Sequence, residues 1–146
     1  MSRERRDDPH APRRRFSTLA REAIEATIPE TRDRRAHWRV GVNGVAVCWP
    51  VRGGWRHVAL RRESERLSGD FGHSDACADL DELARLPGEV HGSPIGVRVG
   101  LDQLLDTPPP PWRAHGETEL RDRLEWIVSR LVSLGPGWLE RHEARS

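Results

Sequence analysis

The sequence predicts an α+β fold in which an antiparallel sheet of four to five strands carries an amino-terminal and a carboxyl-terminal helix packed on one face. Apolar and polar side chains alternate over residues 38–60, and Asn43-Gly44 and Gly53-Gly54 interrupt the alternation. Both dipeptides suit tight hairpin turns, so a three-stranded meander is expected. Segments with apolar residues at the helical period flank the meander, at 16–28 and 118–134.

The 146 residues are enough for one domain with a buried core. Residues 1–15 are charged and contain prolines, which predicts a disordered tail. We expect the domain over residues 16–140 and a polar tail over 141–146. The first helix should end at Pro29, which cannot donate a backbone hydrogen bond. Its apolar stripe consists of Phe16, Leu19, Ala20, Ala23, Ile24 and Ile28.

The alternation in the meander predicts which face of the sheet is buried. In the third strand, Val58 and Leu60 should point to the core, with Trp55 and His57 on the opposite face. Pro50 indicates a sheet edge or a bulge, because proline cannot donate to a strand ladder. The residues expected on the buried face of the first two strands are Val40, Val42, Val45, Val47, Trp49 and Val51.

The middle of the chain gives weaker signals. Residues 63–67 fit either a helical turn or a continuing strand. Residues 68–72 are rich in glycine, serine and aspartate, which predicts a loop from which Phe71 inserts into the core. The remaining expectations are a short helix over 79–86 after a capping pattern, a strand over 95–99 and a helical turn over 101–105.

The helix over 118–134 has the most continuous apolar stripe in the chain. Gly135 should end this helix, and Pro136 should prevent its restart. Trp138 and Leu139 would then fold back onto the domain. The pairs Glu117–Arg121 and Glu119–Arg123 are spaced to attract each other along one helix face. The stripe consists of Leu120, Leu124, Ile127, Val128, Leu131 and Leu134.

The charge distribution disfavours a dedicated nucleic-acid-binding domain. Residues 1–39 contain 11 arginines and 7 acidic residues, a net charge of +4, whereas residues 40–146 contain 13 arginines and 16 acidic residues, a net charge of −3. The chain has no lysine, so its arginine content partly reflects codon bias. Nucleic-acid binding through the arginine-rich segment 1–15 remains an alternative function.

Cys48 and Cys77 are the two cysteines, and neither belongs to a paired motif. The chain has no apolar run near the roughly 18 residues of a membrane span and no apolar stretch at its amino terminus typical of a secretory signal. We therefore expect reduced thiols, a cytoplasmic location and no membrane partner.

No catalytic, cofactor or metal motif is present in the sequence. The glycine-containing segments lack the phosphate-loop pattern, and the histidines and cysteines lack the paired spacing of zinc sites. No cofactor is therefore predicted. An enzyme with a pocket built from His57, His73, Asp75 or His91 is a second alternative function.

The six tryptophans are the most informative aromatic residues. At 100° per residue, Trp126 falls on the polar side of its helix, where it packs under another segment of the chain or meets a partner. The proline run 108–111 is interpreted as a rigid crossover rather than a recognition segment. The leading hypothesis is a non-catalytic protein that binds another protein or itself. The candidate contact residues are Trp126, Arg130, Trp55, His57 and Trp112.

The carboxyl-terminal half carries two short segments of a known type, Arg-x-Gly-Leu from Arg98 to Leu101 and Gly-x-x-Trp-Leu-Glu from Gly135 to Glu140. With Leu104-Leu105 between them, they resemble a family of small bacterial α+β proteins of unknown function. The resemblance covers residues 16–140. It implies an amino-terminal helix, an antiparallel sheet and a closing helix, and it implies no activity or catalytic residues.

Overall fold

The computed structural model describes residues 16–63, 66–76, 80, 97–105 and 117–143. It confirms the α+β fold and has a five-stranded antiparallel sheet. The helices and strands are α2 (Phe16–Thr27), η1 (Pro29–Arg32), β1 (His37–Val40), β2 (Gly44–Val51), β3 (Gly54–Glu63), β4 (Arg66–Ser74), β5 (Val97–Gly100), α4 (Leu101–Leu104) and α5 (Glu117–Glu143).

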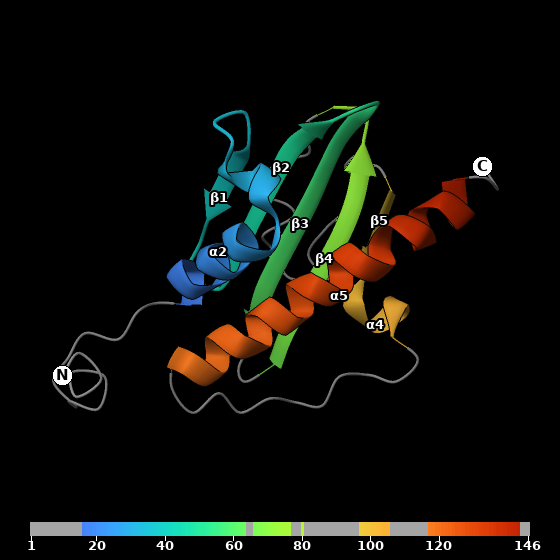
Figure 1. The fold of residues 1–146 in the computed structure, drawn as a ribbon. Coiled ribbons are helices and arrows are strands. Elements are labelled where there is room, and N and C mark those ends of the chain that lie inside the picture. The colour runs from blue at the N-terminus through green and yellow to red at the C-terminus, as the bar shows by residue number, and fades with distance from the viewer. Residues whose placement is uncertain (1–15, 64–65, 77–79, 81–96, 106–116, 144–146) are drawn as a thin grey trace, which may run out of the picture.

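The strands lie side by side in chain order, and each is antiparallel to its neighbours. Helices α2 and α5 cover the same face of this sheet, and α5 crosses it diagonally (Figure 1). An ion pair joins the two helices, with 2.8 Å between Arg121 Nη1 and Glu22 Oε1. The predicted placement of both long helices on one face is therefore confirmed.

Side chains on the face covered by the helices, which we call the helix face, form the core. One row of paired residues crosses the whole sheet, namely Trp38, Val47, Val58, Phe71 and Val99. Trp38 is partly buried at the edge and the other four are buried. The apolar stripe predicted for α2 is buried along its whole length. The meander and the helices therefore need each other, because each supplies the apolar surface that the other buries.

The predicted buried face was wrong at its first two residues. Val40 is 40% exposed and Val42 is 76% exposed. Val40 ends the edge strand β1, and Val42 lies in the turn to β2, so neither has a neighbour on both sides. Pro50 lies in β2 beyond the last pair between β1 and β2, which joins His37 and Cys48. That stretch of β2 is locally a sheet edge, as predicted for Pro50.

The loop predicted over residues 68–72 is part of strand β4. Phe71 is buried in the core as expected, but it is held there by strand pairing rather than by a loop. Gly69 explains why this strand looks irregular in sequence. A Cβ atom at Gly69 would lie 3.0 Å from Ile127 Cγ2 and from Leu131 Cδ1. Glycine therefore allows α5 to lie close to the backbone of β4.

The predicted end of the last helix at Gly135 was also wrong. Helix α5 continues through Gly135 and Pro136 to Glu143. A Cβ atom at Gly135 would lie 2.5 Å from Cδ1 of Phe71, so this glycine makes room for the ring instead of ending the helix. It also lacks the Cβ atom that would crowd the following proline. Leu139 is buried because the helix carries it onto the core, not because the chain folds back.

The helical turn predicted over 101–105 is confirmed as α4, where the Gly100 backbone N–H donates to Gln103 Oε1 at 2.9 Å. The strand predicted over 95–99 is seen as β5 in its described part. The short helix predicted over 79–86 and the proline run 108–111 lie outside the described residues. Within the described part of the chain, no helix is long and apolar enough to cross a membrane.

Gly135→Ala should destabilise the protein although alanine favours helix, because the added methyl group meets the Phe71 ring. Overpacking of this kind costs about 1–3 kcal/mol. Gly137→Ala is the matched control, since its Cβ would lie 3.5 Å from Arg141 Nη1, an ordinary contact. It should stabilise by up to about 1 kcal/mol through helix propensity. Urea unfolding measures both, and equal effects would contradict the packing role of Gly135.

Candidate functional site

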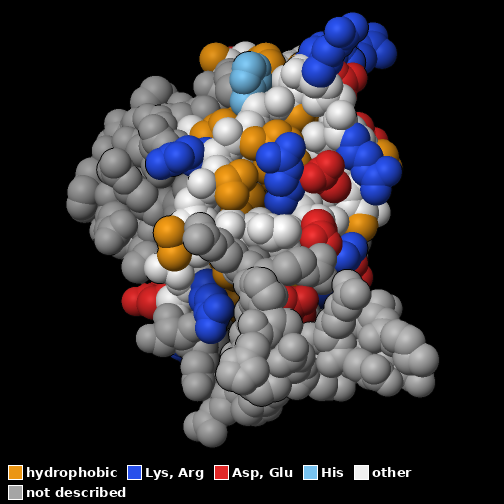
Figure 2. Space-filling view, turned by 90° about the vertical axis from the view of Figure 1, so that its left-hand side faces the viewer, with side chains coloured by type: hydrophobic (Ala, Val, Ile, Leu, Met, Phe, Trp, Pro, Cys, Tyr) orange, Lys and Arg blue, Asp and Glu red, His pale blue; other side chains and the backbone are white. Residues whose placement is uncertain are grey.

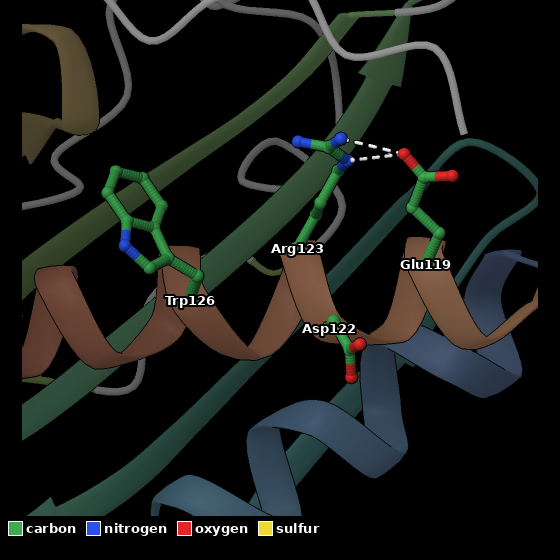
Figure 3. A pocket seen from close by; sticks show the side chains of 4 residues that line it. All are labelled: Glu119, Asp122, Arg123 and Trp126. Carbon is green, nitrogen blue, oxygen red and sulfur yellow. Dashed lines mark hydrogen bonds and ion pairs between the residues drawn. The ribbon is translucent and has the colours of Figure 1, made fainter. Parts of the chain in front are cut away.

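The outward side of α5 carries the first candidate site. Trp126 is 36% exposed there, and its ring lies beside a hollow of about 410 Å³ lined by Glu119, Asp122, Arg123 and Trp126. Figure 3 shows Glu119, Arg123 and Trp126 projecting from one side of the helix in that view, with Asp122 on the other side of its axis. A large aromatic side chain exposed beside a hollow is a common feature of contact surfaces.

The charged residues around this hollow differ in whether they have an ion-pair partner. Arg123 donates to Glu119 from Nη2 at 2.7 Å and from Nε at 3.2 Å, which confirms the predicted pair. The guanidinium of Arg130 lies 5.2 Å from the Trp126 ring centroid, within the range of a cation–π contact. Asp122 is exposed and has no ion-pair partner among the described residues. The hollow is therefore lined by an aromatic ring and by a carboxylate that has no ion-pair partner among the described residues.

The second candidate site lies on the sheet face opposite the helix face, which we call the second face. The row next to the core row places His37, Cys48, His57, Gly72 and Arg98 across the five strands. Cys48 and His57 are fully buried. The strand alternation predicts Trp55 and His57 on this face, and both are candidate contact residues. This face is instead a second buried layer with a polar composition.

Asp70 is the charged centre of the second face. Its carboxylate pairs with the guanidinium of Arg61, whose side chain is 1% exposed. Arg98 Nη1 lies 3.6 Å from Asp70 Oδ2, an ion-pair distance that is too long for a hydrogen bond. Buried ion pairs repay little of their desolvation cost. Such a cluster is therefore weak evidence for stability.

His57 is the least satisfied polar side chain of this face. It is 0% exposed, and neither ring nitrogen has a hydrogen-bond partner within the described part of the chain. The pKa of His57 is lowered from 6.5 to about 3, chiefly by burial, with smaller contributions from the positive charge of Arg98 and from the neighbouring His73. The imidazole is therefore neutral at pH 7, with one N–H donor and one acceptor nitrogen.

The five predicted contact residues do not form one site. Trp126 and Arg130 lie together on the outward side of α5. Trp55 is half-buried at the start of β3, where its ring lies 5.7 Å from that of His37. Complete burial of His57 does not fit a contact residue at the surface. Trp112 lies outside the described residues.

The histidines and the aspartate of the alternative enzyme pocket are brought together only in part. The strand register places His57 on the second face and His73, which pairs with Arg56, on the helix face. Asp75 is exposed beyond the end of β4, and His91 lies outside the described residues. In the described ranges, no three histidine, cysteine, aspartate or glutamate side chains are placed to hold a metal ion.

Cys48 is disulfide-bonded, so the expectation of reduced thiols was wrong for this residue. Cys77, the other cysteine of the chain, lies outside the described residues. The error has a physical cause, because sequence spacing does not report how close two cysteines come in the fold.

The side of the molecule that shows β1 and α2 carries many arginines, but they are mixed with acidic side chains (Figure 2). Arg21 pairs with Glu25 at 3.1 Å and lies over the Trp38 ring at 4.5 Å, and Arg35 pairs with Asp33 at 3.1 Å. These ion pairs do not make a continuous basic surface of the kind that binds nucleic acid. The arginine-rich segment 1–15 lies outside the described residues.

Comparison of the chain with protein-family models, curated protein sequences and solved structures finds no match in any of the three. The resemblance to small bacterial α+β proteins thus gains no support from them. The function of the protein must therefore be inferred from the two sites themselves.

Acidification from pH 7.5 to 5.0 should destabilise the protein through His57. Its folded-state pKa of about 3 lies below the ordinary 6.5, so between these values only the unfolded chain takes up the proton. The free energy of unfolding should fall by about 1.4 kcal/mol per pH unit below 6.5, and therefore by about 2 kcal/mol at pH 5.0. Above pH 6.5, His57 is neutral in both states and causes no loss of stability.

Urea unfolding at the two pH values in phosphate-free buffer measures this loss. His57→Leu should remove it and, by eliminating two unsatisfied nitrogens, should stabilise the protein by about 1–3 kcal/mol at pH 7.5. His37→Gln, at an exposed position of the same row, is the matched control and should leave the pH dependence unchanged. The assignment to His57 is wrong if His57→Leu shows the wild-type pH dependence.

Proposed function

We propose that this protein acts by binding another protein through the outward side of α5. The observation that carries the proposal is the 36% exposure of Trp126 beside a hollow of about 410 Å³. Exposing so large an aromatic ring has no benefit for folding, whereas tryptophan is the residue most enriched among contact hot spots. The surrounding helix is well anchored, because its other side is buried along the core.

The lining of the hollow favours a partner with a basic side chain. Glu119 and Arg123 neutralise each other, which leaves the charge of Asp122 to be matched. A lysine or arginine of the partner would pair with Asp122 and lay its aliphatic portion on Trp126. The carboxylate of Asp122 repels phosphate groups, so this surface favours a protein partner over a nucleic acid.

A cytoplasmic location is part of the same proposal. Disulfide bonds are rare in that compartment, so the disulfide at Cys48 makes the location testable. Thiol labelling of the protein directly after cell lysis reports whether Cys48 is oxidised in the cell. A fully oxidised Cys48 would weigh against the cytoplasm.

Trp126→Ala should abolish partner binding without loss of the fold. Leu134→Ala is the matched control, because Leu134 is 38% exposed on the same helix and does not line the hollow. The measurement is affinity purification of tagged wild type and both variants from cells that express the protein natively, quantified by mass spectrometry. Far-UV circular dichroism verifies folding. Retention of every wild-type partner by Trp126→Ala would refute the proposal.

Asp122→Arg should weaken binding by tenfold or more, because it replaces attraction to a basic side chain by repulsion. Glu140→Arg makes the same charge change at an exposed position of α5 away from the hollow and should have little effect. Titration of the captured partner by biolayer interferometry at low and high salt compares the two variants. Equal affinities would show that the partner does not meet Asp122 with a positive charge.

A further inference from the structure

The exposed residues of α5 follow one another along one side of the helix. A step of four residues advances about 40° around a helix, so Asp122, Trp126 and Arg130 lie on the same side. All three are exposed. Helix α5 lies in front of the sheet in Figure 1, with this side turned away from the strands. A partner that contacts Trp126 therefore also meets a carboxylate before the ring and a guanidinium after it.

The two charges beside Trp126 are not matched within the part of the chain that the structure describes. Asp122 forms no ion pair there, and the contact of Arg130 is with the Trp126 ring. Asp122 and Arg130 are about 12 Å apart along the helix, too far to pair with each other. The surface is thus acidic on one side of Trp126 and basic on the other. Such a surface is complementary to a copy of itself that runs in the opposite direction.

An antiparallel copy of α5 supplies this reversed surface. When two α5 helices pair around a twofold axis at Trp126, residues equally far before and after Trp126 lie at the same level. Asp122 of each copy then lies level with Arg130 of the other, about 6 Å along the helix from the axis. The ion pair forms twice, and the two Trp126 rings meet at the centre, where contact hot spots typically lie. A parallel pair would instead place like charges together, which repel.

The neighbouring charged residues are compatible with the antiparallel pair. Glu119 lies level with Ser133 of the second copy, and Arg123 lies level with Ser129. Both serines are exposed, so each charged side chain meets a small neutral one and no like charge. The net charge of the whole chain is only +1, so two copies repel each other little.

We infer that the partner bound by the outward side of α5 is a second copy of this chain, held in an antiparallel pair of α5 helices centred on Trp126. The inference rests on the proposed function, and it identifies the basic side chain that Asp122 attracts as Arg130 of the second copy. The two helices overlap over residues 117–135, a length of about 27 Å. One helix pair is a small contact among specific interfaces, so the dimer is weak and reversible.

Sedimentation velocity of the full chain from micromolar to millimolar concentration tests the inference. The wild type should shift from monomer to dimer as the concentration rises, and Trp126→Ala should remain a monomer because the central contact is lost. A wild type that stays monomeric over the whole range would overturn the inference. The proposed function would survive that result if Trp126→Ala still loses partners of different sequence in the affinity purification.

Exchange of the two charges tests the antiparallel arrangement itself. Asp122→Arg and Arg130→Glu should each weaken dimerisation by tenfold or more, because each places like charges at the same level. An equimolar mixture of the two variants should dimerise with nearly wild-type affinity, because every arginine then meets a carboxylate of the other variant. Glu140→Arg is the matched control, since it makes the same charge change as Asp122→Arg at an exposed position outside the overlap.

Circular dichroism verifies the fold of each variant before mixing. Both substituted positions are exposed, and arginine and glutamate both favour helix, so the single variants should be folded monomers. Recovery of the dimer on mixing would support the pairing of Asp122 with Arg130 between copies. A mixture that dimerises no better than its components would refute this pairing, even if the wild type dimerises.

Discussion

The structure depends on how closely α5 can approach β4. Two glycines set that distance, Gly69 on the strand and Gly135 on the helix. A Cβ atom at Gly135 would collide with the Phe71 ring, and one at Gly69 would crowd side chains of α5. The buried ring of Phe71 packs directly against Gly135. Because packed interiors tolerate little extra volume, this contact fixes the position of α5 over the sheet. The position of α2 follows, since it shares the same core and is paired to α5 through Glu22.

The two faces of the sheet serve different physical purposes. The helix face is apolar and supplies the hydrophobic free energy of folding. The second face buries Arg61, Asp70 and His57 and partly buries Arg98, and removing these polar groups from water costs free energy that their ion pairs offset only in part. A protein selected for stability alone would cover that face with apolar side chains. The outward side of α5 is a third surface, separated from the second face by the whole thickness of the domain (Figure 1).

Local patterns in the sequence were enough to predict α2, the meander and most of α5, because hydrophobic period and turn residues act within a few positions. Strand β4 was missed, since Gly69 is dictated by α5, more than fifty residues later in the chain. The end of α5 was misplaced for the same reason at Gly135. The helical angle of Trp126 predicted that it lies on the polar side of α5, but not whether another segment of the chain covers it. The Arg61–Asp70–Arg98 cluster was not predictable, because only strand register brings it together.

The order of strands in the sheet also bears on how the polypeptide folds as it is made. Each strand pairs with its neighbour in the chain, so the hairpins can close one after another while synthesis continues. The pair Arg121–Glu22, by contrast, joins positions 99 residues apart. Until α5 leaves the ribosome, the apolar side of the sheet has only α2 to cover it. A nascent chain that forms its sheet before α5 is released would therefore expose apolar surface, which favours aggregation until α5 docks.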